Sequence, residues 1–205
     1  MSGPSSPVEI RPARLDDLEA VDRLLVETFG NSAGSVFAGV PAEVQLRLRR
    51  RLRRLAARPA EGLLVAAGRT GIAGVVLLAT AESHGRPPLA ALAALRPLGV
   101  LGLIRFCVAA WATIHRPAAD EVYLFGLAVA PSHRRQGIAE LLLRRAEEEA
   151  RRLGKTVMSA DVAPTNRASL ALCEKRGFGP GEPAGRRWRR LILRRGSVHL
   201  RKALS

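Results

Sequence analysis

The feature that most constrains this chain is a continuous strand–loop–helix unit in its second half. Residues 121–129 (EVYLFGLAV) have the length and apolar content of a buried strand, and residues 130–133 (APSH) turn out of it. Apolar residues at helical spacing then predict a helix from about Gly137 to Leu153, with Gly154 at its C′ position. Such a helix begins with unpaired backbone N–H groups at the positive end of its dipole. The unit therefore predicts an anion-binding loop at the end of a central strand.

The loop itself, Arg134-Arg135-Gln136-Gly137-Ile138-Ala139, suits a pyrophosphate. Gly137 allows a positive φ or a close backbone approach, and Ala139 leaves space where a larger side chain would meet a phosphate. Arg134 and Arg135 add fork-shaped donors. The loop is neither a Walker A loop nor the three-glycine dinucleotide fingerprint. The alternative interpretation is an ordinary strand–turn–helix with arginines on its surface.

The rest of the chain alternates predicted helices and strands. Helices are expected from Asp16, an N-cap with Glu19 as its capping-box partner, from Pro41 to about Ala57, and from Arg167 to Lys175. Strands are expected at residues 8–11, 63–67, 74–79, 155–163, 187–193 and 197–201, the second and third forming a hairpin. On the 137–153 helix we expect surface pairs Glu147–Arg151 and Glu148–Arg152, and an apolar stripe of Ile138, Leu141, Leu142, Ala146, Ala150 and Leu153.

A long apolar insertion, residues 83–119, separates the hairpin from the 121–129 strand. Residues 89–95 and 99–114 have helical character, and Arg96-Pro97 and Arg105 interrupt the apolar run well short of the ~20 residues that a membrane span needs. We expect a helical segment buried against the domain, a partner chain or an apolar acceptor. A homodimer contact is one such use.

The net charge of +15 first points to an acidic partner such as nucleic acid. No recognisable nucleic-acid motif accompanies it, and a polyanionic ligand accounts for part of the excess. The arginines between Arg47 and Arg54 on the second helix form either an acidic-acceptor surface or a solvated face. We favour the solvated face, because charge runs usually serve that purpose.

The two cysteines, Cys107 and Cys173, have neither metal-ligand spacing nor the pattern of a disulfide framework. A reducing, cytoplasmic setting is the simplest expectation. Residues 1–7 are small and polar, so we expect a flexible tail and no secretory signal. His84, His115, His133 and His199 are scattered singly, and no metal site is expected from them.

Two motifs in this order of elements resemble the GNAT superfamily of N-acetyltransferases. Residues 134–139 match its Q/R-x-x-G-x-G/A signature, and residues 166–178 match its later N-x-x-A-x-x-L-Y-E-x-x-G-F helix. The resemblance is dense over residues 121–178, looser over 8–81, and leaves the insertion unexplained. It implies one α/β (α+β) domain over residues 8–205. A central mixed, mostly antiparallel sheet would be flanked by helices, with the helical insertion between the third and fourth strands.

The resemblance also implies a site for acetyl-CoA as co-substrate, with no metal. Backbone groups of Leu127, Ala128 and Val129 would bind the pantetheine arm as an added strand beside a β-bulge. The 134–139 loop would hold the pyrophosphate. Asn166 would bond the pantetheine, and it also suits a helix N-cap.

The catalytic residues depart from the superfamily pattern. Cys173 stands where many relatives carry a tyrosine proton donor, so it is either a weak proton donor or a packing residue. Tyr123 stands where some relatives carry a glutamate base, and it would relay a proton or line the acceptor site. Asp120 and Glu121 are further acids that would act through water.

The expected activity is acetyl transfer from acetyl-CoA to a primary amine of a small molecule or peptide, by direct attack. The alternative is a GNAT-like module that binds acyl-CoA with weak or no catalysis, which Cys173 in place of tyrosine favours. Nucleic acid is not expected as a partner, nor is a transmembrane segment.

Overall fold

A computed structural model describes residues 8–30, 37, 39–56, 58–69, 71–83, 95–99, 102–104, 106, 115–181 and 197–204. The predicted tail, the predicted strand at residues 187–193 and most of the insertion, with Cys107 and His84, lie outside these residues.

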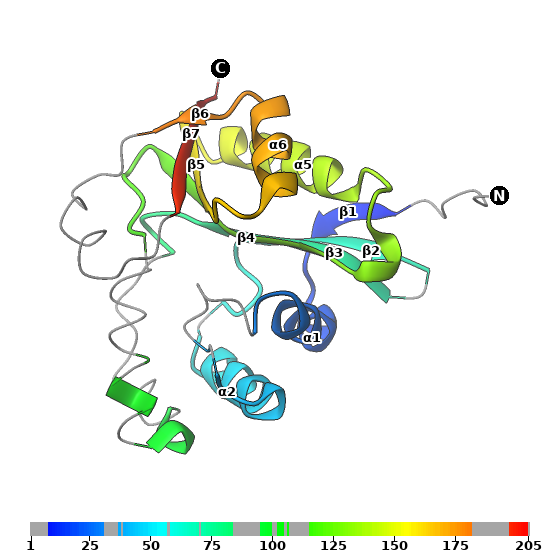
Figure 1. The fold of residues 1–205 in the computed structure, drawn as a ribbon, viewed down its shortest axis with the longest axis vertical. Helices are drawn as coiled ribbons and strands as arrows, with labels where there is room; N and C mark the ends of the chain where they lie inside the picture. The colour runs from blue at the N-terminus through cyan, green and yellow to red at the C-terminus, as the bar shows by residue number, and fades with distance from the viewer. Residues whose placement is uncertain are drawn as a thin grey trace.

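A seven-stranded sheet of order β1-β2-β3-β4-β5-β7-β6 forms the centre of the molecule (Figure 1). Every neighbouring pair is antiparallel except β4 and β5, which are parallel. The sheet is thus mixed and mostly antiparallel, as the sequence predicts. Its strands are β1 (Glu9–Pro12), β2 (Leu63–Gly68), β3 (Gly71–Ala79), β4 (Glu121–Val129), β5 (Val157–Val162), β6 (Gly179–Pro180) and β7 (Val198–Ala203).

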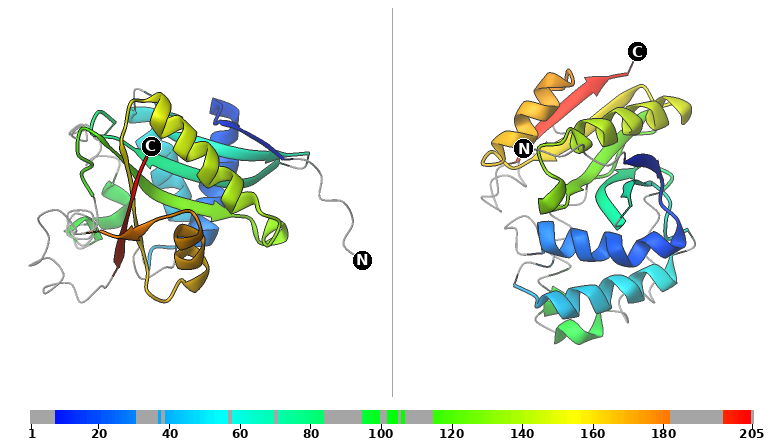
Figure 2. Two further views of the ribbon diagram at one scale, coloured as in Figure 1. Left: turned by 90° about the horizontal axis from the view of Figure 1, so that it is seen from above. Right: turned by 90° about the vertical axis from the view of Figure 1, so that its right-hand side faces the viewer.

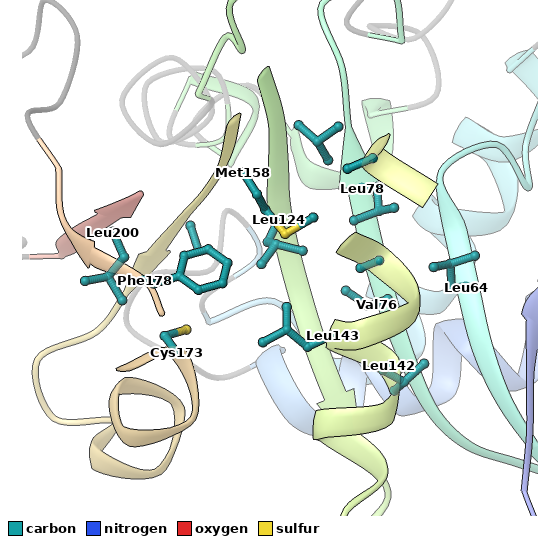
Figure 3. Close-up of a cluster of buried hydrophobic side chains, with 14 of the residues drawn as sticks. Leu64, Val76, Leu78, Leu124, Leu142, Leu143, Met158, Cys173, Phe178 and Leu200 are labelled. Atoms are coloured by element: carbon teal, nitrogen blue, oxygen red, sulfur yellow. The ribbon is translucent and has the colours of Figure 1, made fainter. Parts of the chain in front are cut away.

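Helices cover both faces of this sheet (Figures 1 and 2). One face carries α5 (Ile138–Arg152) and α6 (Arg167–Lys175), and the other carries α1 (Leu18–Phe29). The helix α2 (Ala42–Leu55) packs against α1, on its far side from the sheet. The main core lies between α5, α6 and the sheet (Figure 3), and a second core lies under α1.

The described part of the insertion packs against this domain through some of its apolar side chains. Leu95 is 3% exposed and shares an apolar cluster with Leu48 of α2, which is fully buried. Leu98, Leu103 and Phe106 pack against the same cluster. Of the three uses expected for this segment, the described residues therefore show packing against the domain itself.

The arginine run on α2 is only partly solvated. Arg53 Nη2 donates to the carboxylate of Asp22 at 2.6 Å, and Asp22 is 2% exposed. Arg50 pairs with the exposed Glu19 of α1, and the Arg49 guanidinium lies 5.3 Å from the Phe37 ring centroid. The expectation of a simple solvated face is thus wrong for Arg49 and Arg53, because Phe37 and Asp22 provide partly buried partners. It holds for Arg50, whose pair with Glu19 is exposed.

The start of α1 differs from the predicted cap. A 3₁₀ turn, Leu15–Asp17, precedes α1, and Asp17 rather than Glu19 closes the turn by accepting the backbone N–H of Arg14 at 2.7 Å. Asp17 also accepts two hydrogen bonds from Arg11 of β1. The predicted Asp16–Glu19 capping box is therefore wrong, because Arg11 holds the acid one residue further on.

The buried face of α5 also differs from the predicted stripe. Leu141 and Leu153 are 41% and 43% exposed, whereas Leu143 is 1% exposed. Glu147 is buried and binds Arg176 and Lys202, and Arg152 pairs with Glu149. The expected surface role of Glu147 is therefore wrong, because α6 and β7 bring cations over it. Arg152 is on the surface as expected, but its partner is Glu149 and not Glu148.

Within the described residues, no helix combines the length and apolarity needed to cross a membrane.

Candidate functional site

β4 and β5 separate in the middle of the sheet. Their parallel pairing covers Glu121–Leu124 and Val157–Ala160 and then stops, although both strands continue. At the same point the register against β3 shifts: Leu78 faces Leu124 and Leu77 faces Gly126, which leaves Phe125 as the extra residue of a bulge. The β5-facing edge of β4 beyond the bulge is therefore available to an extended ligand.

The segment predicted to bind pantetheine, Leu127–Val129, forms this open edge. Leu127 and Val129 pack toward the α5 core, and Ala128 packs toward the α1 core, so all three side chains are used for packing. Recognition of a ligand here can only come from the backbone, which is what an added strand requires.

The 134–139 loop connects β4 to α5 and is open to solvent. Gly137 has φ 78° and Arg135 has φ 63°, both in the left-handed region. Among the described residues, no hydrogen bond occupies the backbone N–H groups of residues 135–140, whereas Leu141 N–H bonds Gly137 O at 3.1 Å. An ideal Cβ at Gly137 would meet nothing within 4 Å. These free donors at a helix N-terminus can hold an anion.

The side chains of this loop divide their roles. Arg134 Nε donates to Val129 O at 3.2 Å and fixes the loop to the end of β4. Gln136 Nε2 donates to Ser132 O at 3.3 Å, in the turn that follows β4. Ser132 Oγ and His133 Nδ1 lie within hydrogen-bond distance, at 2.9 Å. His133 thus contacts its own loop. Arg135 is exposed.

Asn166 caps α6, as one of its two predicted roles requires. Its Oδ1 accepts the backbone N–H of Ser169 at 3.1 Å. Because β4 and β5 are parallel, the residues that follow them leave the same edge of the sheet. Asn166 and the 134–139 loop are therefore on one edge, at the end of the gap between the two strands.

Glu121 lies in a buried polar cluster and is not an exposed strand-end acid. It accepts hydrogen bonds from Ser159 and from the Ala118 N–H, and His115 Nε2 lies 2.9 Å from its Oε1. Burial alone would raise its pKa, but the hydrogen bonds from His115, Ser159 and Ala118 outweigh burial and lower the pKa to about 2. Glu121 is therefore anionic at neutral pH and ties the end of the insertion to β5.

Tyr123 belongs to a second, adjoining set of polar groups. Its hydroxyl donates to Asp161 Oδ2 at 3.2 Å, and His199 Nδ1 lies 3.0 Å from Asp161 Oδ1. The His115 ring joins the two sets, with centroids 4.5 Å from Tyr123 and 5.6 Å from His199. The sequence gives a signal for Asp161, since it alternates with apolar neighbours on β5, but none for two histidines 84 positions apart.

These polar side chains share the sheet face opposite α5. Val122 and Leu124 belong to the α5 core, so Glu121 and Tyr123 point the other way. The same alternation places Ser159 and Asp161 on that face. The six residues of the polar cluster are His115, Glu121, Tyr123, Ser159, Asp161 and His199.

Cys173, the other predicted catalytic residue, lies on the α5 side. It is 6% exposed and points from α6 into the main core beside Phe178 (Figure 3). Burial raises the pKa of its thiol. The structure therefore does not bring Tyr123 and Cys173 together. Within the described residues, no three His, Cys, Asp or Glu side chains are placed to hold a metal ion.

Comparison with known proteins gives one family match. Residues 41–178, more than half of the chain, match the model of the Acetyltransferase (GNAT) family. The [ribosomal protein bS18]-alanine N-acetyltransferase of Escherichia coli K12 is 37% identical over 59 residues, which are 29% of this chain and 40% of that protein. The matched stretches span only 20% to 40% of the curated relatives.

Solved structures share the fold. An N-acetyltransferase from Staphylococcus aureus Mu50 superposes with a TM-score of 0.67 at 20% identity, covering 95% of this chain and all of that one. A putative acetyltransferase from Salmonella typhimurium, determined with its cofactor acetyl-CoA, gives 0.58 at 21% identity, covering 98% and 95%. The family match covers the bulged strand, the anion-binding loop and the capped helix, and the chain therefore belongs to the GNAT family of acetyltransferases.

Proposed function

We propose that the protein is an N-acetyltransferase that moves the acetyl group of acetyl-CoA to a primary amine by direct attack. The observation that carries the proposal is the open edge of β4 continuing into a loop of unpaired N–H groups. An extended pantetheine arm that continues into a pyrophosphate needs these two features in this order. The name of the E. coli relative and the acetyl-CoA of the Salmonella structure support the same ligand and reaction class.

In this proposal the pyrophosphate lies over residues 134–139, and the pantetheine passes Asn166 at the same end of the gap and runs along Leu127–Val129 toward the bulge. The thioester then lies beside the bulge at Phe125, where β4 and β5 separate. Backbone N–H groups of β4 would stabilise the oxyanion of the tetrahedral intermediate. Tyr123 would face the acceptor side, and the acceptor would be a small-molecule or peptide amine.

The placement of acetyl-CoA is tested by Gly137→Glu. The new carboxylate would stand against the phosphates, so we expect the Kd for acetyl-CoA, measured by calorimetry, to rise at least about tenfold, or 1.4 kcal/mol. The matched control is Gly154→Glu at the other end of α5. Gly154 has φ 69°, and its added Cβ would also meet nothing, so that variant carries the same backbone strain and charge. Equal affinities of the two variants would show that the phosphates lie elsewhere.

The reaction is tested by release of CoA thiol from acetyl-CoA with spermidine, benzylamine, aniline, kanamycin and an alanine-terminated peptide. We expect turnover of at least one basic amine. Retained acetyl-CoA binding without turnover of any amine would favour the acyl-CoA-binding module over the enzyme.

A further inference from the structure

Attack on a thioester requires a neutral amine, whereas most primary amines are protonated at neutral pH. An acetyltransferase therefore gains from a group that removes a proton next to the thioester. No described residue of the 134–139 loop is an acid or base of suitable strength, and His133 just before it is bonded to Ser132. The polar cluster, on the sheet face opposite α5, contains acids and histidines that could accept this proton.

Asp161 is the charged member of this cluster that reaches the gap between β4 and β5. It follows Ala160, the last residue of β5 that pairs with β4. Its side chain is 22% exposed, compared with 8% for Glu121 and 4% for His199. An ammonium group arriving at the separation of the two strands would therefore meet Asp161 before the other two groups.

Both oxygens of Asp161 are engaged in a way that fixes its neighbours. Tyr123 donates to one oxygen, and His199 Nδ1 contacts the other. Since an ionised carboxylate can only accept, a neutral His199 carries its proton on Nδ1 and leaves Nε2 able to accept one. The arrangement is a carboxylate that orients an imidazole, as in enzymes that use histidine as a base.

We propose that Asp161 and His199 together accept the proton of the acceptor's ammonium group, with Tyr123 as a positioning residue. This inference rests on the proposed function. One N–H bond of the ammonium breaks and its proton passes to the pair, whose charge changes from −1 to zero. The amine lone pair forms the C–N bond. The C–S bond then breaks, its electrons stay on sulfur, and the second proton lost by nitrogen balances the thiolate.

The charged surroundings of the pair fit this role. Burial would raise the pKa of Asp161, but the hydrogen bonds that it accepts from His199 and from the Tyr123 hydroxyl outweigh burial and lower the pKa. A carboxylate of low pKa is ionised at neutral pH, so Asp161 offers a negative charge to the arriving ammonium group. Among the described residues, His115 contacts the His199 ring, and Arg201 of β7 lies with His199 against Gly181, which follows β6. Glu121 of β4 lies on the other side of His115.

The test compares Asp161→Asn and His199→Gln with the wild type, using whichever basic amine of the panel is turned over. We expect acetyl-CoA affinity within about twofold of wild type, and we expect kcat/KM at neutral pH to fall roughly a hundredfold or more. We also expect the variants' rate to keep rising with pH as the amine itself deprotonates. Aniline is already neutral under these conditions, so its turnover should fall far less in either variant.

Two controls separate proton transfer from loss of structure. Tyr123→Phe should lower kcat moderately while keeping the wild-type pH profile. Glu121→Gln removes the more buried carboxylate, and it should lower the melting temperature without changing the shape of the profile. Variants that bind acetyl-CoA and keep wild-type kcat/KM and pH profile would overturn the inference and leave the proposed function intact. A wild-type protein that acetylates no amine would contradict both the proposed function and this inference.

Discussion

Cys173 shows how one side chain can match a family motif and still have a different environment. Its thiol lies in the main core, on the opposite sheet face from Tyr123, and burial raises its pKa. Proton transfer to a thiolate becomes less favourable as the pKa of the donor rises. Of the two roles open to Cys173, its surroundings favour packing.

Cys173→Ala tests this choice. If the thiol only packs, the variant should lose about 1 kcal/mol of stability through the small cavity, and its turnover rate should stay close to that of the wild type. Urea denaturation and steady-state kinetics measure the two effects. A turnover rate that drops roughly a hundredfold or more, with intact acetyl-CoA binding, would instead identify the thiol as the proton donor.

At the scale of elements, α5 connects the β2–β4 part of the sheet to α6 and β7. It packs on β2, β3 and β4, and its buried Glu147 binds Arg176 after α6 and Lys202 of β7 at 2.7 and 2.9 Å. The Glu147 carboxylate is 3% exposed, and its pKa is lowered because these two cations outweigh its burial. The Glu147 carboxylate therefore links α5, which follows the anion-binding loop, to both α6 and β7.

Glu147→Gln should destabilise the protein by about 3 kcal/mol, because it leaves two partly buried cations without their anion. The matched control is Glu148→Gln, the next residue of α5, whose exposed side chain pairs with Arg145. That variant should change the free energy of unfolding by about 0.5 kcal/mol or less. Similar unfolding free energies in urea for the two variants would contradict the role given to Glu147.

The sequence predicts these elements better than their contacts. β4 and α6 match their predicted bounds, since a long apolar run and a capped helix are local signals. The anion-binding loop is local too. Glu147, Asp161 and His199 acquire their roles from strands and helices far away in the chain, so helical spacing misassigns Glu147 and gives no sign that the histidines meet. Long-range pairing is what single-sequence patterns lack.

At the scale of the whole molecule, buried anions make the fold sensitive to acid. In the folded state the pKa of Glu121 falls from an ordinary 4.5 to about 2. The folded protein therefore binds this proton less readily than the unfolded chain, and Glu121 stabilises the fold above pH 4.5. That stabilisation, at most about 3 kcal/mol, is lost as the pH falls toward 2.

We expect the free energy of unfolding, measured in urea at a series of pH values, to fall steeply as the pH is lowered from 4.5 to about 2. Glu121→Gln should be less stable at neutral pH and show a flatter decline, since it has no proton to bind there. Parallel curves for the variant and the wild type would show that other carboxylates govern acid unfolding.

The two left-handed residues of the anion-binding loop carry different information for anyone comparing related sequences. Gly137 has a left-handed backbone, in which any residue with a Cβ would destabilise the fold by about 1–2 kcal/mol. This preference for glycine holds whether or not a phosphate is bound. Its invariance among relatives would thus be no evidence of ligand binding. Arg135 accepts the same cost while a glycine would avoid it. Persistence of a large cationic residue at that position would therefore record selection for the side chain itself.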